Sequence, residues 1–393
     1  MNAGFRIVWV VRAAKLAMAS YRLRCLVPAI YLSDLGWQSI ILEKDESLDN
    51  FVPQEKDILI IIKDLSPKRL DLARRFREKN LTVIYDLCDP IFFEEYRGGR
   101  DIAGGIFLKD MLGLAHYIST SSPSIATGLR HICGYSQNVF LIRDAALKPL
   151  HVKRLMNHLQ SQGVDLGSRV NPSYPNVKRS TIIRQLLLRR LLPLNFWRLH
   201  PLRHRIVWFG KSGGEYDNHA DISIGFRALC HWREELSKLN EEVPIELAIM
   251  SNSSLKNFRA HFSDWPFPVT YSDWSMLGFQ RLMQSADLAL VPVGSDHIAQ
   301  CSSGNRITQA LAFRVPVICD KLQGLEPLYP YLGLDGILKS GKTYLTDPVY
   351  RRKHLDGARK ILYQHYSPQS IARTWDQLFQ RIATKKVMEA PLL

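Results

Sequence analysis

The sequence predicts an α/β protein with two doubly wound domains, each a parallel sheet covered by helices on both faces. Short apolar runs alternate with helical patterns along most of the chain. The runs are continuous rather than alternately polar, which is typical of strands buried on both faces of a parallel sheet. The series stops once, at a basic stretch containing several prolines, and then begins again. At 393 residues the chain is also long for a single hydrophobic core.

The first series of strands and helices fills the chain before residue 145. Helical stretches such as Pro67–Asn80 and Ser122–Cys133 separate its apolar runs. The predicted strands are 5–11, 38–43, 57–62, 81–87, 116–120 and 138–144.

The second series begins at residue 204. Its predicted helices are Ile222–Leu239, Met276–Ser285 and Asn305–Phe313. Ligands of doubly wound sheets bind at the carboxyl ends of the strands, so the last residues of each run are the first candidates for a site. The predicted strands are 204–210, 244–251, 267–273, 286–293 and 315–320.

The basic segment, residues 145–204, separates the two series. Between Arg143 and Arg205 the chain has thirteen Lys or Arg residues and only two acids. Together with its prolines, this composition predicts an insertion or a linker. The predicted organisation is therefore an N-terminal domain, the basic segment, a C-terminal domain and a closing helix, at residues 1–144, 145–204, 205–365 and 366–393.

The net charge of +15 favours phosphate-rich partners, such as anionic lipids, nucleotide diphosphates or nucleic acid. A solvated insertion without a ligand is the alternative for the basic segment. Residues 178–199 suggest a helix on a membrane surface, but Arg184, Arg189 and Arg190 fall around such a helix rather than on one face. No recognisable nucleic-acid module is present in the sequence, so we expect no nucleic-acid partner.

The cysteines and the N-terminus predict the compartment. Six widely spaced cysteines form no CxxC pair, which suits buried free thiols in a reducing compartment and predicts no metal site. The first apolar run is too short for a signal peptide, and no stretch reaches the length of a membrane span. We expect a cytoplasmic protein, and the basic segment leaves peripheral contact with the inner face of a membrane open.

The stretch CSSGNRITQALAFRVPVICD, residues 301–320, predicts a loop, a helix and a strand. The unpaired amides and positive end of the helix form an anion site, to which serine hydroxyls add donors. Glycine lets the main chain approach a phosphate closely, and an arginine one residue into the helix offers a forked contact. A serine-capped core helix with a surface arginine is the alternative. The residues concerned are Ser302, Ser303, Gly304, Asn305 and Arg306.

Several passages of the chain resemble nucleotide-sugar-dependent glycosyltransferases of the GT-B fold, especially the retaining family 4. They are ASYRLRCLVPAIYLSDLGW (19–37), the stretch 64–90, the donor-half pattern at 271–328, and YSPQSIARTWDQLFQRI (366–382). The resemblance implies two Rossmann-like domains facing across a cleft, with the C-terminal helix crossing back to the N-terminal domain. It also implies sugar transfer with retention of configuration, a nucleotide diphosphate sugar as donor, a glycan or lipid-linked acceptor, and neither cofactor nor metal ion.

The chain departs from the family at the phosphate helix. The two glutamates of the family's Glu-x7-Glu motif fall on Cys301 and Gln309, and the glycine common before Pro-Val is Arg314. Cysteine binds sugar hydroxyls poorly, whereas Gln309 can still hydrogen-bond a ribose. Because of these changes, the resemblance does not identify the sugar, and to a lesser extent it leaves the activity open.

The resemblance assigns the remaining donor contacts. In WFGKSGGEY (208–216), Lys211 lies in a glycine loop and is expected beside the diphosphate, a solvated lysine on a turn being the alternative. Arg306 and Lys211 are the expected catalytic cations, because the leaving diphosphate needs fixed positive charge. The predicted donor-binding residues are Gly210, Ser302, Ser303, Gly304, Asn305, Gln309 and Glu326.

In the first domain, candidates follow from the ends of the strands. Ser20, Arg22 and Arg24 come after the first strand and are predicted to bind the acceptor, a surface helix being the alternative. Ionisable residues also end the strands 57–62 and 81–87. Among them we favour Asp89 as the catalytic carboxylate that faces the acceptor.

The sequence therefore predicts a glycosyltransferase, and rival functions stay open. A nucleotide-sugar epimerase or hydrolase could use the same fold. A non-catalytic scaffold or binding protein could keep the fold without the chemistry, and the residues at positions 301 and 309 are the best support for it.

Overall fold

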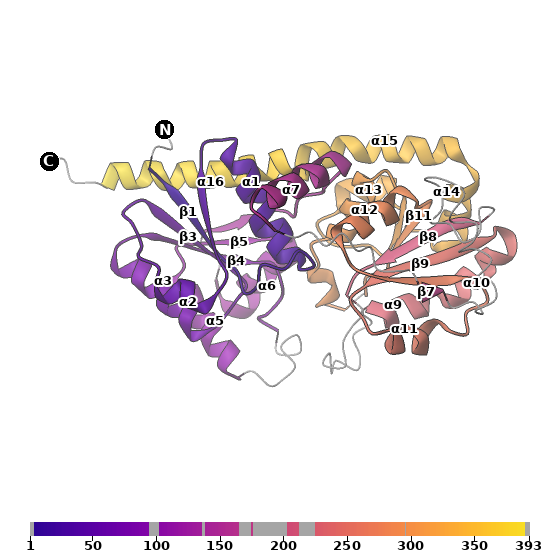
Figure 1. Ribbon diagram of the computed structural model, residues 1–393, viewed down its shortest axis with the longest axis horizontal. Helices are drawn as coiled ribbons and strands as arrows, with labels where there is room; N and C mark the ends of the chain where they lie inside the picture. The colour runs from indigo at the N-terminus through magenta and orange to yellow at the C-terminus, as the bar shows by residue number, and fades with distance from the viewer. Residues whose placement is uncertain are drawn as a thin grey trace. The chain divides into compact units, whose positions relative to one another are not determined.

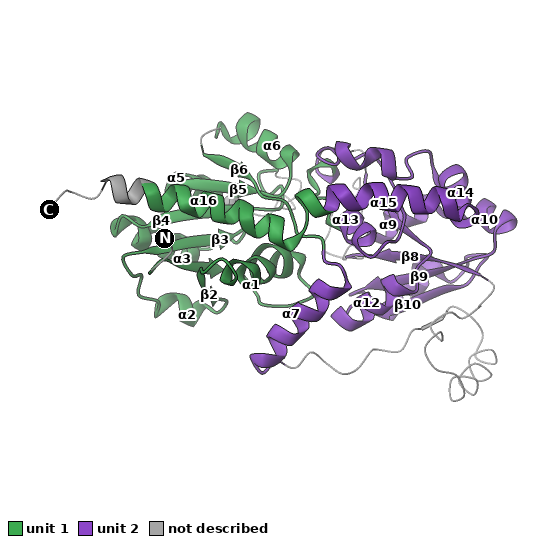
Figure 2. Cartoon of the chain, turned by 90° about the horizontal axis from the view of Figure 1, so that it is seen from above, with its two compact units in different colours: residues 1–146, 300–305, 363–393 green, residues 147–299, 306–362 purple. Residues whose placement is uncertain are grey.

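In the computed structural model, the chain forms two compact units (Figure 2). Unit 1 comprises Met1–Ala146, Gln300–Asn305 and Tyr363–Leu393, and unit 2 comprises Leu147–Ala299 and Arg306–Leu362. The described residues are 4–93, 102–135, 138–164, 174–175, 203–211, 225–294 and 296–389.

The sheet of unit 1 has six parallel strands in the order β2-β1-β3-β4-β5-β6 (Figure 1). The strand order reverses between β1 and β3, so this sheet has its topological switch point there. The strands are β1 (Arg6–Val10), β2 (Gln38–Leu42), β3 (Asp57–Ile62), β4 (Thr82–Leu87), β5 (Tyr117–Thr120) and β6 (Val139–Leu141).

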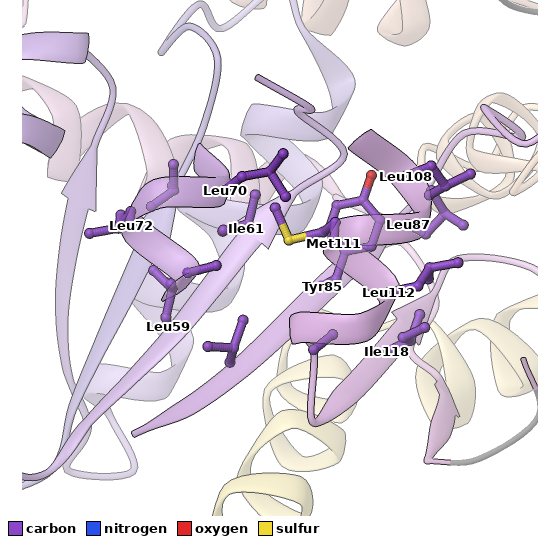
Figure 3. Close-up of a cluster of buried hydrophobic side chains, with 14 of the residues drawn as sticks. Leu59, Ile61, Leu70, Leu72, Tyr85, Leu87, Leu108, Met111, Leu112 and Ile118 are labelled. Carbon is purple, nitrogen blue, oxygen red and sulfur yellow. The ribbon is translucent and has the colours of Figure 1, made fainter. Parts of the chain in front are cut away.

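Both faces of this sheet are buried, as the continuous apolar runs require. On one face, β3 and β4 pack against α3 (Pro67–Glu78) and α5 (Ile102–Leu114), which also contact each other. Figure 3 shows this cluster, in which Tyr85 and Leu59 from the sheet lie with Met111 from α5. Because side chains alternate along a strand, the neighbouring residues of the same strands enter the opposite layer.

The opposite layer consists of α1 (Val27–Ser33) and α16 (Pro368–Glu389), which pack together. The ring of Trp9 in β1 meets the ring of Trp375 in α16 edge to face, at 5.4 Å between centroids. Trp37 Nε1 also donates a hydrogen bond of 2.7 Å to Asp376 of α16. The last helix of the chain therefore belongs to the same unit as the first strand. The other helices of unit 1 are η1 (Ser20–Leu26, a π-helix), α2 (Asp45–Asp49) and α6 (Pro123–Cys133).

The sheet of unit 2 has the order β12-β11-β8-β9-β10-β7, with β7 antiparallel to β10 and the other pairs parallel. Its strand order reverses between β8 and β11. An aromatic core fills one face, with Trp208, Phe226 and Phe262 fully buried. The strands are β7 (Tyr174–Pro175), β8 (His204–Phe209), β9 (Ile245–Ser251), β10 (Val269–Asp273), β11 (Leu288–Val291) and β12 (Val317–Cys319).

Every predicted strand of the two series appears in these sheets, which confirms the predicted fold class. The helix predicted at Ile222–Leu239 is wrong as one element, because α9 (Gly225–His231) ends before α10 (Arg233–Glu242). Trp232 lies between them with φ −90° and ψ 4°, and its amide bonds to the carbonyl of Leu229 in a tighter turn. Residues 222–224 lie outside the described part of the chain.

The remaining elements belong mostly to unit 2, but residues 300–305 and 363–365 among them belong to unit 1. Most of the basic segment lies outside the described residues, which cover only 145–164, 174–175 and 203–204 of it. Among the helices in the described part of the chain, none is long and apolar enough to cross a membrane. The other elements are α7 (Pro149–Ser161), α11 (Leu255–Phe262), α12 (Met276–Gln284), η2 (Ala299–Cys301), α13 (Asn305–Ala312), η3 (Glu326–Tyr331), η4 (Ile337–Gly341), α14 (Lys342–Thr346) and α15 (Pro348–His365).

Candidate functional site

The predicted phosphate helix is α13, which begins at Asn305 as expected. Gly304 precedes it with φ +68°, a left-handed conformation that glycine adopts without strain. Gly304 N donates to Ser302 Oγ at 3.4 Å, and Ser302 is exposed. The sequence pattern thus produces a glycine turn that leads into the positive end of a helix.

A carboxylate of the protein already contacts this turn within unit 1. Ser303 Oγ donates to Asp144 Oδ2 at 2.6 Å, and Asn305 Nδ2 donates to the same oxygen at 3.2 Å. Asp144 follows β6 and is buried. Two of the side chains predicted to bind a phosphate are therefore held by an internal anion, which leaves Ser302 and the main chain of the turn as the stronger candidates from this segment.

Asp144 is part of a buried ionic network. Arg24, with 1% of its surface exposed, donates from Nε to Asp86 Oδ2 at 2.9 Å and lies 3.4 Å from Asp144 Oδ1. Ser119 Oγ donates to Asp86 Oδ1 at 2.6 Å. Burial opposes the charge of Arg24, but the two carboxylates outweigh this effect and raise its pKa. These contacts favour a structural role for Arg24, and its predicted contact with an acceptor stays a prediction without support from its surroundings.

Ser20 and Arg22 lie in the π-helix η1, which leads directly into α1. Arg22 donates to the carbonyl of Leu16, and burial lowers its pKa to about 10 despite the nearby charge of Asp144. Short π-helical turns are rare and are frequent at functional sites. The role of Ser20 and Arg22 in acceptor binding stays a prediction.

The carboxyl ends of β3 and β4 bring Lys63 and Asp89 together. The ammonium of Lys63 forms an ion pair with Asp89 Oδ2, and each side chain is 29% exposed. Lys63 follows β3, which is one of the two strands at the switch point of this sheet. Asp89, the predicted catalytic carboxylate, is thus partly exposed to solvent beyond the carboxyl end of β4, as the sequence predicts.

In unit 2, Arg306 lies over the switch point of the sheet. A Cβ atom added to Gly210, the residue after β8, would lie 3.2 Å from Arg306 Nη1, so the guanidinium packs against the main chain of this glycine. Arg306 Nη2 also donates a long hydrogen bond of 3.4 Å to the carbonyl of Pro292, just after β11. The side chain therefore connects the carboxyl ends of β8 and β11, between which the strand order reverses.

The charge of Arg306 is only weakly compensated. Burial lowers its pKa to about 10, so that it stays cationic at neutral pH. Among the residues that the structure describes, no carboxylate pairs with it. A partly desolvated cation at a switch point is a candidate for binding an anionic ligand, because a ligand's charge would offset the cost of burial.

The other predicted donor contacts have different surroundings. Lys211 is exposed and follows Gly210, while residues 212–224 of its glycine loop lie outside the described part of the chain. Gln309 is buried, and its Oε1 accepts from Leu147 N at 3.3 Å, so that its amide supports the fold of unit 2. Glu326 Oε1 accepts from Gly324 N at 2.8 Å within the turn before η3. Their predicted contacts with a donor stay predictions.

Sequence reasoning missed two carboxylates. Asp144 holds the turn before α13, and Asp320, after β12, accepts from Val293 N at 2.8 Å. Burial raises the pKa of Asp320. Both residues follow the last strand of a series, so the strand-end rule that selected Asp89 could have found them. In the part of the chain described, no group of histidine, cysteine or acidic side chains is arranged to hold a metal ion.

Comparison of the whole chain with solved structures gives several matches. HepE of Anabaena in complex with UDP is 13% identical, with 96% of this chain and 100% of that chain covered and a TM-score of 0.58. An E. coli trehalose-6-phosphate structure bound with UDP-2-fluoro glucose is 10% identical, with 95% and 98% covered and a TM-score of 0.57. A putative UDP-N-acetylglucosamine 2-epimerase from Listeria monocytogenes is 10% identical, with 94% of each chain covered and a TM-score of 0.50.

The chain has the GT-B fold. No family model and no curated protein sequence matches it. The predicted GT-B fold is thus confirmed, and membership of the retaining family 4 stays a prediction. At such low sequence identity a likeness shows the fold alone, so a function must come from the residues at the strand ends.

Proposed function

We propose that this GT-B chain is a glycosyltransferase that takes a sugar from a nucleotide diphosphate sugar. The observation that carries the proposal is the placement of Arg306 at the switch point of the unit 2 sheet, against Gly210 and the carbonyl of Pro292. Doubly wound sheets bind ligands at this point, and a guanidinium offers a planar fork that matches a phosphate. Arg306 would stabilise the charge that develops on the departing diphosphate.

The solved structures support this donor class. HepE was solved with UDP and with UDP-glucose, and the E. coli structure with UDP-2-fluoro glucose. Uridine diphosphate sugars are therefore the first donors to test. The main chain at the start of α13, Ser302 and Lys211 would complete the diphosphate contacts.

The proposed reaction breaks the bond between the anomeric carbon and the diphosphate and forms a glycosidic bond to an acceptor hydroxyl. The acceptor oxygen attacks the anomeric carbon directly, so no protein nucleophile is required, and the hydroxyl proton passes to the departing diphosphate. Retention of configuration and independence of a metal ion follow from the family resemblance and form part of the proposal. Asp89 would face the acceptor, a glycan or lipid-linked glycan, and the basic segment could hold an anionic membrane surface.

A thermal-shift experiment tests the donor class. UDP at 100 times its dissociation constant should stabilise the chain by about 2.7 kcal/mol and raise Tm by about 3 °C. Uridine and UMP should give much smaller shifts, because they lack the diphosphate. A series of other nucleoside diphosphates would identify the base. If none of them raised Tm, the proposed function would be wrong.

Gly210→Ala tests the contact beneath Arg306. The added methyl group would lie 3.2 Å from Arg306 Nη1 and 3.3 Å from Trp208 Cζ2, so these side chains must shift by a few tenths of an ångström, and the guanidinium is the more flexible of the two. We expect the affinity for the nucleoside diphosphate, measured by calorimetry, to fall about tenfold, which corresponds to about 1.4 kcal/mol. Gly113→Ala is a matched control, because a Cβ atom there meets nothing within 4 Å. Unchanged affinity in Gly210→Ala would argue against a ligand at this point.

A non-catalytic binding protein is the second candidate, because Asp144 holds Ser303 and Asn305 and because Gln309 supports the fold. Such a protein would bind a nucleoside diphosphate and consume no donor. With no acceptor present, a hydrolase would instead consume the donor fully, and an epimerase would convert it into a mixture of two epimers. Product analysis with and without a mixture of glycan acceptors separates these outcomes from sugar transfer.

A further inference from the structure

Lys63 has an unusual backbone conformation at the carboxyl end of β3, in the sheet of unit 1. Its φ is +45°, in the left-handed region that non-glycine residues rarely adopt. It follows β3 directly, at the carboxyl end of the sheet and beside the switch point. Such conformations cost free energy and persist where the surroundings enforce them, often at functional sites.

Neighbouring contacts fix this conformation from both sides of the residue. Lys63 N donates to the carbonyl of Asp86 at 2.9 Å, and Tyr85 Oη donates to the carbonyl of Lys63 at 3.3 Å. Tyr85 is fully buried in the core, and Asp86 is held by the buried Arg24. The turn after β3 is thus tied to β4 rather than free to relax.

The enforced turn directs the ammonium of Lys63 onto Asp89 Oδ2. Burial disfavours the charge of Lys63, but the nearby carboxylate of Asp89 outweighs it and raises the pKa of the lysine. Within the described part of the chain, the other carboxylate oxygen of Asp89 accepts no hydrogen bond, and its side chain remains 29% exposed. Asp89 is therefore held in one orientation and still has an oxygen for a ligand.

We propose that Lys63 is a positioning residue that holds Asp89 so that its second oxygen accepts a hydrogen bond from a hydroxyl of the sugar acceptor. The inference rests on the proposed function and adds a residue to it. The ligand class is a polyhydroxylated acceptor, since an ionised carboxylate accepts hydrogen bonds only. The strained backbone is the cost of this orientation.

The decisive variant is Lys63→Gly, which removes the ammonium and suits the backbone. Glycine adopts this φ without strain, so we expect Tm to rise or to stay within about 3 °C of the wild-type value. We expect kcat/KM for the acceptor to fall about tenfold or more, the scale of losing one oriented hydrogen bond to a charged group. KM for the donor should stay unchanged, because neither Lys63 nor Asp89 is among the proposed donor contacts.

Three control experiments separate positioning from folding. Asn80→Gly is the matched backbone control, because Asn80 also has a positive φ of 54°. It lies before the amino end of β4, at the other end of the strands from Lys63. It should leave kcat/KM unchanged. In an Asp89→Asn background, Lys63→Gly should add less than about a twofold loss, since both residues act through one contact. Lys63→Arg should restore part of the activity.

The outcomes distinguish this inference from the proposed function. An active wild-type chain together with a Lys63→Gly variant of equal kcat/KM for the acceptor would overturn the inference and leave the donor site intact. Additive losses in the double variant would also overturn it. A wild-type chain that neither binds UDP nor transfers sugar would overturn both proposals together.

Discussion

Replacing Arg306 with alanine should reduce turnover at least ~10²-fold, the scale for losing one group that stabilises developing charge. The guanidinium lies at the carboxyl ends of β8 and β11 and has no carboxylate partner in the described part of the chain. The charge of Arg306 therefore forms no ion pair that would stabilise the fold. Tm should be unchanged or slightly higher once this partly desolvated cation is removed. Steady-state kinetics with a UDP-sugar and a thermal melt of the same preparation measure both effects.

The control for this prediction is Arg314→Ala. Arg314 pairs at 2.9 Å with Asp356 on the surface, where both side chains are about half exposed, so its loss should change neither turnover nor Tm appreciably. Arg306→Lys should retain part of the turnover, because a lysine keeps the charge and loses the fork. Turnover of the wild-type rate in Arg306→Ala would contradict the assigned role.

Replacing Asp86 with alanine should destabilise the protein by about 3–5 kcal/mol, because it leaves Arg24 buried without its main counter-charge. Asp86 is fully buried and accepts hydrogen bonds from both Arg24 and Ser119. Chemical denaturation, followed by circular dichroism, measures the free energy of unfolding. This loss of stability should be larger than that of Arg306→Ala, Arg314→Ala or Asp356→Ala.

The double variant Asp86→Ala with Arg24→Met provides the control. Removing the uncompensated charge should recover part of the stability, since an apolar pair of similar volume often replaces a buried ion pair at little cost. Asp356→Ala, at the exposed pair with Arg314, should cost less than about 1 kcal/mol. A loss below 1 kcal/mol in Asp86→Ala would show that the buried network contributes little to stability.

The fold was predictable from local features of the sequence. Runs such as ILIII at 58–62 are apolar throughout, and all five residues are buried in β3. The glycine turn and the helix that starts at Asn305 were predictable for the same reason, because a helix start is a local pattern of polar and glycine residues.

The partners of charged residues were not predictable in the same way. Arg24 is predicted to bind an acceptor, and nothing in the sequence indicated that it forms a buried pair with Asp86, which is 62 residues further along the chain. Asp144 was absent from the predicted site, and it holds Ser303, 159 residues away. An arginine on a helix looks the same in the sequence whether its neighbours in space are water or carboxylates.

The sequence by itself determined the two parallel sheets, the glycine turn before α13 and the residues at the strand ends, because burial pattern and backbone preference act over a few neighbouring residues. Only the tertiary structure decided which of the candidate cations form an ion pair with an internal carboxylate. It paired Arg24 and Lys63 with carboxylates and left Arg306 against a glycine and a carbonyl. That outcome depends on which strand ends become neighbours, and chain segments far apart in sequence settle it together.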